Sequence, residues 1–104
     1  MVHKLVLTAA FGVALAIPGL AAAGDPERGA GLVASCVACH GPGGRSSMPR
    51  YPNLAGQHEA YLLSALEAYR DGDREDPEMA PQVMRFDDQE LADIAAYFAE
   101  QDCD

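Results

Sequence analysis

The sequence predicts a small all-α domain, built from three to four short helices and long loops. Two observations indicate this class. Three stretches carry apolar residues at the three- and four-residue spacing of a helix, and no stretch shows the strict alternation of a half-buried strand. Segments rich in glycine, proline and serine separate these stretches and favour loops.

Residues 1–23 have the pattern of a secretory signal peptide. A basic start and an apolar run over 5–16 precede helix breakers and then three alanines at 21–23, which resemble a cleavage site. Cleavage there leaves a single domain, residues 24–104. An uncleaved membrane anchor is the alternative. The apolar run is short for a span, so we expect no stable membrane insertion after cleavage.

The first helix of the mature chain is expected to follow Asp25, which can cap it, with Pro26 at its first position. We expect this helix to run without interruption into Cys36. Residues 41–56 are rich in glycine, proline and serine and are expected to form a loop.

A second helix is expected over roughly 58–71, and Gly72 marks its end. One face of this helix is apolar and consists of Leu62, Ala65, Leu66 and Tyr69. Residues 73–86 contain Pro77 and Pro81 and are expected to form a second loop.

The last helix is expected to begin at Asp87, because Glu90 three residues later completes the pattern of a capping box. Its apolar face consists of Leu91, Ile94, Ala95 and Phe98, with Tyr97 alongside. Three short helices and two long loops bury little apolar surface. A prosthetic group in the core is therefore expected to hold the domain together.

The most informative motif is Cys36-Val37-Ala38-Cys39-His40. Two cysteines separated by two residues, with a histidine directly behind, are the attachment site of a c-type haem. One helical turn presents both thiols to the porphyrin, and His40 coordinates the iron. The alternatives are a redox-active dithiol, which needs no histidine, and a zinc site, which needs a second ligand pair. Because the motif occurs once, we predict one covalent haem, and its attachment outside the cytoplasm agrees with export to the periplasm.

The iron needs a sixth ligand, for which the chain offers Met48, Met79, Met84 and His58. A late residue, in a loop that covers the haem face opposite His40, is favoured. Met79 lies in such a loop between two prolines, which stiffen the backbone around a weakly bound thioether. Met84 is expected to be a core residue and His58 a solvated first-turn residue. Met79 is therefore the expected ligand, Met84 the main alternative, and an open iron site stays possible.

The mature chain is strongly acidic. Without Lys4 of the signal peptide, six arginines stand against sixteen aspartates and glutamates, a formal charge of about −10. Nucleic acid and anionic membranes are therefore not expected as partners. Such a charge can steer the protein toward a basic docking patch on a redox partner, although it serves equally to keep a small domain soluble.

Three segments extend the haem motif toward a known family. They are Cys36 through Gly41, Pro52-Asn53-Leu54-Ala55-Gly56-Gln57, and Tyr69-Arg70-Asp71-Gly72 with the last helix behind it. Together they resemble the class I c-type cytochromes, in particular small bacterial proteins with one haem and single halves of dihaem proteins. The resemblance covers nearly all of the mature chain. It implies the cytochrome c fold, with short helices and long loops wrapped around one covalent haem.

The resemblance also implies roles for individual residues. The carbonyl oxygen of Pro52 would accept a hydrogen bond from the second ring nitrogen of His40 and orient the ring. Gly29 would allow the first helix to approach the last near Tyr97. The family places its axial methionine ahead of a capped last helix, which again favours Met79.

Two further residues, Gln57 and Tyr61, are candidates to line the haem edge. Both are equally consistent with ordinary surface and core positions.

Coordination by His40 and Met79 would fill both axial positions, so no substrate could reach the iron without displacing a ligand, and it would raise the reduction potential. We therefore predict a periplasmic one-electron carrier between larger redox proteins, and not an enzyme. The alternative is a cytochrome subunit docked on a sulfur-oxidising flavoprotein or another redox enzyme. A gas sensor or peroxidase with an open iron site is the third possibility.

Cys103 lies near the end of the chain, where tails are usually disordered. An odd cysteine in an exported protein suggests an intermolecular disulfide or a free thiol. We expect an incidental thiol, with a disulfide-linked dimer as the alternative.

Overall fold

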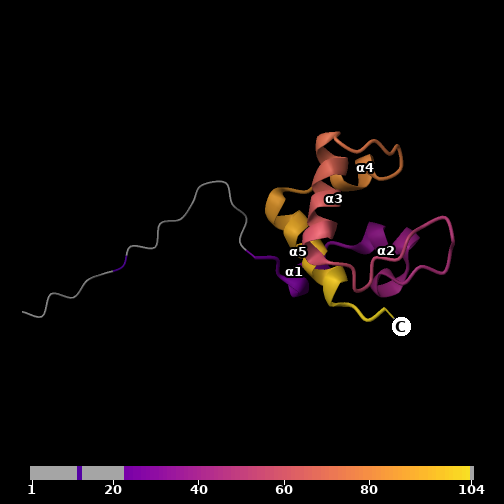
Figure 1. Cartoon of the computed structure of the whole chain (residues 1–104), viewed down its shortest axis with the longest axis horizontal. Helices are drawn as coiled ribbons and strands as arrows, with labels where there is room; N and C mark the ends of the chain where they lie inside the picture. The colour runs from indigo at the N-terminus through magenta and orange to yellow at the C-terminus, as the bar shows by residue number, and fades with distance from the viewer. Residues whose placement is uncertain (1–11, 13–22, 104) are drawn as a thin grey trace, which may run out of the picture.

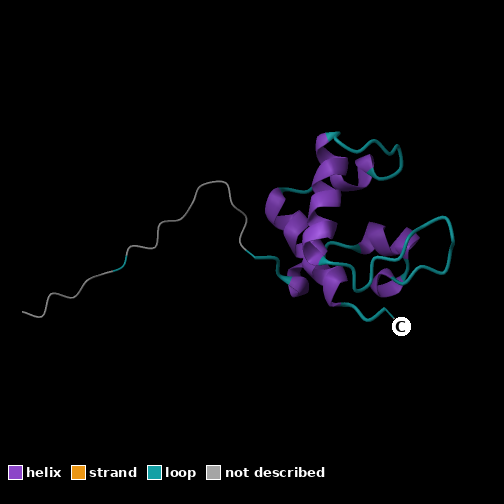
Figure 2. Ribbon diagram, in the orientation of Figure 1, coloured by secondary structure: helices purple, strands orange, loops and turns teal. Residues whose placement is uncertain are grey.

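The computed structural model describes residue 12 and residues 23–103, so the predicted signal peptide lies almost wholly outside the described residues. The described chain is helical and contains no strand, which confirms the all-α class (Figure 2). Along the chain the elements are α1 (Pro26–Ala30), α2 (Ala34–His40), a 3₁₀ turn η1 (Pro42–Gly44), α3 (Glu59–Asp71), α4 (Ala80–Val83) and α5 (Asp88–Glu100). None of the helices in this part of the chain has the length and apolar character needed to span a bilayer.

The first predicted helix is interrupted. The N–H of Gly31 bonds to the carbonyl oxygen of Arg28 at 3.1 Å, and that of Leu32 to Gly29 at 2.9 Å. Such three-residue hydrogen bonds tighten and end a helix, so α1 stops before α2 begins. The prediction of one continuous helix into Cys36 is therefore wrong.

The second predicted helix agrees with α3. Gly72 follows its last residue with φ of +86°, a left-handed conformation that glycine adopts without strain. The loop predicted over 73–86 contains an additional short helix, α4, which the sequence did not predict. Pro81 stands at the start of α4, where an absent N–H leaves no hydrogen bond unmade.

The last helix, α5, is the centre of the fold. The carboxylate of Asp87 accepts the N–H of Glu90 at 2.8 Å and the carboxylate of Glu90 accepts the N–H of Asp87 at 3.1 Å, which confirms the capping box. Its predicted apolar face is buried, and none of these residues is more than 2% exposed: Leu91, Ile94, Ala95 and Phe98. Both α1 and α3 pack against α5 (Figure 1).

Gly29 is buried where α1 crosses α5. A Cβ atom at this position would lie 2.0 Å from the carbonyl oxygen of Asp93 and 2.9 Å from the Cβ atom of Tyr97. No side chain fits there, so the role expected of Gly29 is confirmed: a glycine lets the first helix contact the last.

Arg70 joins the end of α3 to the start of α5. Its guanidinium pairs with Asp71 at 2.9 Å and with Asp88 at 2.7 Å. It also donates a hydrogen bond to the carbonyl oxygen of Phe86 at 3.4 Å. The segment that contains α4 is thereby closed at its C-terminal end.

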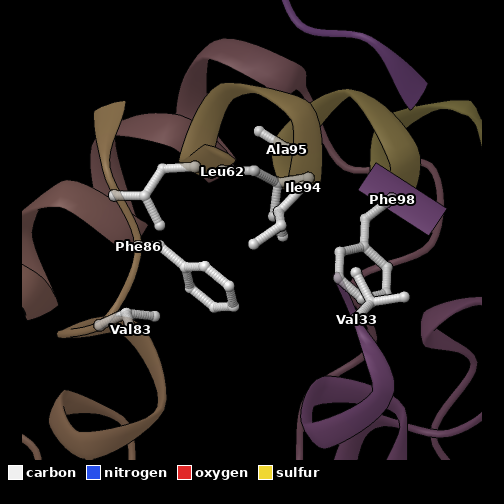
Figure 3. Close-up of a cluster of buried hydrophobic side chains, with 8 residues drawn as sticks. Val33, Leu62, Val83, Phe86, Ile94, Ala95 and Phe98 are labelled. Atoms are coloured by element: carbon white, nitrogen blue, oxygen red, sulfur yellow. The ribbon is translucent and has the colours of Figure 1, made fainter. Parts of the chain in front are cut away.

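The core is one apolar cluster between these helices. Its members are Val33, Leu62, Val83, Phe86, Leu91, Ile94, Ala95 and Phe98. Figure 3 shows Val33 beside Phe98 next to α2, and Val83 beside Phe86 next to α4, with Ile94 of α5 between the two pairs. The cluster therefore connects the segment that carries the cysteine motif with the segment that follows Met79.

The end of the chain contacts the loop before α3. The thiol of Cys103 donates a hydrogen bond to the carbonyl oxygen of Ala55 at 3.3 Å. A Cβ atom on Gly56 would lie 2.3 Å from the sulfur of Cys103. The thiol is exposed yet packed against the loop, so the chain has defined contacts as far as residue 103.

Candidate haem site

The helix α2 carries the whole cysteine motif within about two turns. Cys36 and Cys39 are three residues apart, a spacing that places side chains next to each other on a helix surface. The helix ends at Gly41, which has φ of +83°, and a Cβ atom there would lie 2.0 Å from the carbonyl oxygen of Arg45. The glycine directly after His40 is therefore required by the close return of the chain.

The two thiols differ in their surroundings. Cys36 is half-buried against the core cluster and Cys39 is exposed, and neither forms a disulfide. Burial raises the pKa of the Cys36 thiol, although the Ser35 hydroxyl and the positive charge of Arg85 oppose this. Both sulfur atoms are available for bonds to a porphyrin.

The imidazole of His40 is buried, with 6% of the residue exposed. Its Nδ1–H donates a hydrogen bond to the carbonyl oxygen of Pro52 at 2.8 Å, the contact that the resemblance implies. The ring of Tyr51 stands edge-on to the imidazole, with centroids 6.3 Å apart. Because Nδ1 carries the proton, Nε2 keeps its lone pair for a metal ion.

The loop before α3 holds Pro52 in place. The side chain of Asn53 accepts the N–H of Ser46 at 2.7 Å, and the N–H of Leu54 bonds to the carbonyl oxygen of Gly44 at 2.8 Å. Both bonds tie the residues directly after the proline to the start of the loop, so the oxygen that His40 contacts belongs to a fixed backbone segment.

The candidates for a sixth ligand differ in how far their side chains are buried. Met79 is half-buried and packs against the same core cluster as Cys36. Met84 is 68% exposed and Met48 is 49% exposed, and His58 is exposed as expected. The expectation that Met84 is a core residue is wrong, because Val83 and Phe86 occupy the buried positions beside it.

The two residues considered for the haem edge lie at the surface. Tyr61 is 54% exposed on α3. The side chain of Gln57 is exposed, and its oxygen accepts the N–H of His58 at 2.8 Å.

Sequence reasoning missed two contacts around the site. Tyr51 lies against His40, and no motif pointed to it. Arg50 pairs with Glu78, which joins the loop of Pro52 to the loop of Met79. In the sequence, the signal for the second contact is the opposite charge of Arg50 and Glu78 in two predicted loops.

The donor set fits a covalently attached haem. It combines two free thiols on one helical turn, an oriented imidazole, and a thioether on the opposite segment of one apolar cluster. Within the described residues, no group of three or more histidine, cysteine or carboxylate side chains could hold a metal ion.

Comparison with known proteins agrees with this fit. The sequence model of the Cytochrome c family matches residues 26–101. Cytochrome c4 of Pseudomonas aeruginosa is 50% identical over 88 residues, which are 84% of this chain and 44% of that protein. Cytochrome c-554(548) of Halomonas halodenitrificans is 45% identical over 83 residues, which are 77% of this chain and 100% of that protein.

Comparison with solved structures also finds cytochromes among the similar proteins. Reduced recombinant cytochrome c4 from Pseudomonas stutzeri is similar with a TM-score of 0.74 and 45% identity, over 77% of this chain and 47% of that chain. A thiosulfate dehydrogenase from Marichromatium purpuratum is similar with a TM-score of 0.69 and 36% identity, over 86% of this chain and 23% of that chain. The chain thus spans about half the length of the cytochrome c4 relatives and the full length of cytochrome c-554(548).

Proposed function

The chain belongs to the cytochrome c family, and on this premise we propose that it is a periplasmic one-electron carrier rather than an enzyme. It has the all-α cytochrome c fold and binds one covalent haem c. Under this proposal Cys36 and Cys39 would hold the haem through two thioether bonds, and His40 and Met79 would coordinate the iron.

One observation carries the proposal. A buried imidazole, held at Nδ1 by the carbonyl oxygen of Pro52, stands directly behind two free thiols, and the thioether of Met79 packs against the same cluster as Cys36. This arrangement leaves Nε2 and a thioether sulfur as donors of the kind that closes both axial positions. A closed site suits a change of charge rather than the binding of a substrate.

The haem, when bound, supplies an iron centre that gains or loses one electron. The chain sets the conditions for that change. The carbonyl of Pro52 accepts the Nδ1–H of His40 and so orients the ring, with Nε2 left as the donor that would hold the iron. The thioether of Met79, as a ligand, would favour the reduced state. The apolar cluster excludes water, so little solvent has to rearrange when the charge changes.

The test of this function is a redox titration of the full-length haem protein followed by visible spectroscopy. We expect a single one-electron transition, and no binding of carbon monoxide by the ferrous protein while the methionine is bound. Met79→Ala should abolish the weak sulfur-to-iron band at the red end of the ferric spectrum, whereas the exposed control Met84→Ala should keep it. If Met79→Ala keeps the band, Met79 is not the ligand.

The signal-peptide pattern of residues 1–23 supports a periplasmic location. We propose that residues 1–23 are removed as a signal peptide and that residues 24–104 form the mature domain. Gly24 would then be the first residue, and it lies so close to α5 that a Cβ atom on it would be 2.2 Å from the carbonyl oxygen of Ala92. Mass spectrometry of the exported protein should find Gly24 at the N-terminus.

The proposed partners are redox proteins that donate and accept electrons through a basic docking patch. The formal charge of the mature chain, about −10, favours this, because opposite charges accelerate encounter. The rate of electron exchange with a basic partner should therefore fall steeply as salt is added. A rate that is independent of salt would argue against a basic patch.

The alternative is a subunit docked on a redox enzyme, and the likeness to part of a thiosulfate dehydrogenase favours it as the second candidate. Gel filtration of native extract distinguishes the two, since a free carrier elutes at its own mass.

A disulfide-linked dimer through Cys103 stays a prediction. Non-reducing gel electrophoresis tests it, because a band at monomer mass alone excludes the dimer.

A further inference from the structure

Met79 stands in a capped turn. The carboxylate of Asp76 accepts the N–H of Glu78 at 2.8 Å and the N–H of Met79 at 3.0 Å. The carbonyl oxygen of Asp76 accepts the N–H of Ala80 at 3.0 Å, and Pro77 fills the first position of the turn. Asp76 is therefore the N-cap of a helical turn that leads into α4 and has Met79 as its third residue.

Both backbone polar groups of Met79 are fixed by this turn. Its N–H is held by Asp76, and its carbonyl oxygen accepts the N–H of Gln82 at 3.0 Å. The backbone has helical angles, with φ of −79° and ψ of −39°. Val83, one turn further on, is only 2% exposed and anchors α4 in the core. The backbone on both sides of the Met79 side chain is therefore fixed.

We propose that Asp76 is a positioning residue for the thioether of Met79. The proposal rests on the proposed function, in which Met79 is the axial ligand. A methionine side chain has three rotatable bonds, so its sulfur loses freedom when it binds a metal. A backbone that is already fixed reduces the freedom that remains to be lost, and it therefore strengthens the bond by pre-organisation.

A cap that only stabilised α4 would not act on the ligand, and the chain contains a matched control for that case. Asp25 is also followed by proline and glutamate. Its carboxylate accepts the N–H of Glu27 at 2.9 Å and the N–H of Arg28 at 3.3 Å. This turn leads into α1 and carries no candidate ligand. Loss of either cap weakens a helix start, but only loss of the Asp76 cap should loosen the sulfur.

The experiment measures how fast imidazole displaces the sixth ligand of the ferric, full-length haem protein. Removal of an N-cap side chain shifts a helix-start equilibrium by about fivefold, so Asp76→Ala should raise the displacement rate by about that factor. Asp76→Asn keeps an oxygen acceptor and should stay within about twofold of the unmodified protein. Asp25→Ala should leave the rate unchanged.

The outcomes separate this proposal from the proposed function. If Met79→Ala removes the sulfur-to-iron band but Asp76→Ala does not change the displacement rate, the positioning role is wrong and the ligand assignment stands. A rise of equal size in Asp25→Ala also overturns the positioning role, because a general loss of stability then explains it. If Met79→Ala keeps the band, both are wrong.

A second measurement covers the case in which Asp76→Ala fails to fold. Hydrogen exchange of the Met79 amide in the reduced, unmodified protein should be slowed at least about tenfold relative to an unprotected amide. Exchange at the unprotected rate means that Asp76 does not hold this amide, and it would overturn the proposal.

Discussion

The turns at Asp25-Pro26-Glu27 and Asp76-Pro77-Glu78 have the same three residues and the same hydrogen bonds. In each, one carboxylate oxygen accepts two successive N–H groups and the aspartate carbonyl accepts the N–H four residues later. The donors of that last bond are Gly29 in the first turn and Ala80 in the second. The local structure of both turns thus follows from the same short sequence.

The two turns differ in what they are packed against. The first brings Gly29 into contact with the backbone of α5, and the backbone N–H of Asp25 bonds to the buried carboxylate of Asp93 at 2.8 Å. The second leads from Met79 into α4 and pairs through Glu78 with Arg50. One turn therefore fixes two helices against each other, and the other fixes a candidate ligand.

Gly29→Ala should cause the largest loss of stability, because the new methyl group would lie 2.0 Å from the carbonyl oxygen of Asp93. A backbone atom cannot move aside easily, so we expect a loss of about 3 kcal/mol in the free energy of unfolding. Ala80→Gly at the equivalent position of the second turn should cost no more than about 1 kcal/mol. Guanidinium denaturation of the haem protein measures both. Equal losses would show that the helix contact does not distinguish the turns.

Replacing Asp93, which contacts the first turn, should cause the next largest loss of stability. This loss should depend on pH. Asp93 is 2% exposed and accepts hydrogen bonds from the N–H of Asp25 at 2.8 Å and from Gln89 at 2.9 Å. Burial alone would raise the pKa of Asp93, but these hydrogen bonds and the charge of Arg28 outweigh it and hold the pKa below its ordinary value.

The lowered pKa of Asp93 sets how stability changes with pH. A carboxyl group with a lower pKa in the folded state stabilises the fold above its unfolded pKa of about 3.9, and this contribution is lost as the pH falls through the folded value. Asp93→Asn should lower stability at pH 7 by about 2 kcal/mol and flatten the loss of stability below about pH 4. Denaturation curves from pH 7 to pH 3 test this. Parallel curves for the two proteins would mean that Asp93 is not responsible.

The comparison also shows how far the sequence predicts this fold. The caps at Asp25 and Asp87 and the stop at Gly72 were predicted correctly, because each depends on residues within four positions. The turn at Asp76 carries the same signal as that at Asp25, yet its prolines were interpreted as marks of a loop, and α4 was missed.

Features set by packing could not be predicted in this way. The break between α1 and α2 comes directly after Gly29, which contacts α5, an element distant in the sequence. The exposure of Met84 depends on which neighbours turn toward the core, and Val83 and Phe86 do so. At the site, the cysteine motif specified two thiols and His40 by itself, whereas the edge contact of Tyr51 with His40 required the folded loop.

Breaking the ion pairs beside the two turns should cause the smallest losses of stability. Arg50 is 68% exposed and its partner Glu78 49%, so Arg50→Gln should cost at most about 0.5 kcal/mol, and the cost should vanish at high salt. Arg28 is 62% exposed and pairs with Asp25 at 3.3 Å, but it also lies 3.6 Å from Asp93, whose side chain is 4% exposed. Arg28→Gln should therefore cost more and depend less on salt, because a buried charge is poorly screened. Denaturation at low and high salt compares the two variants. A larger loss in Arg50→Gln would mean that the bridge between the loops of Pro52 and Met79, and not the buried carboxylate, is the stronger of the two tethers.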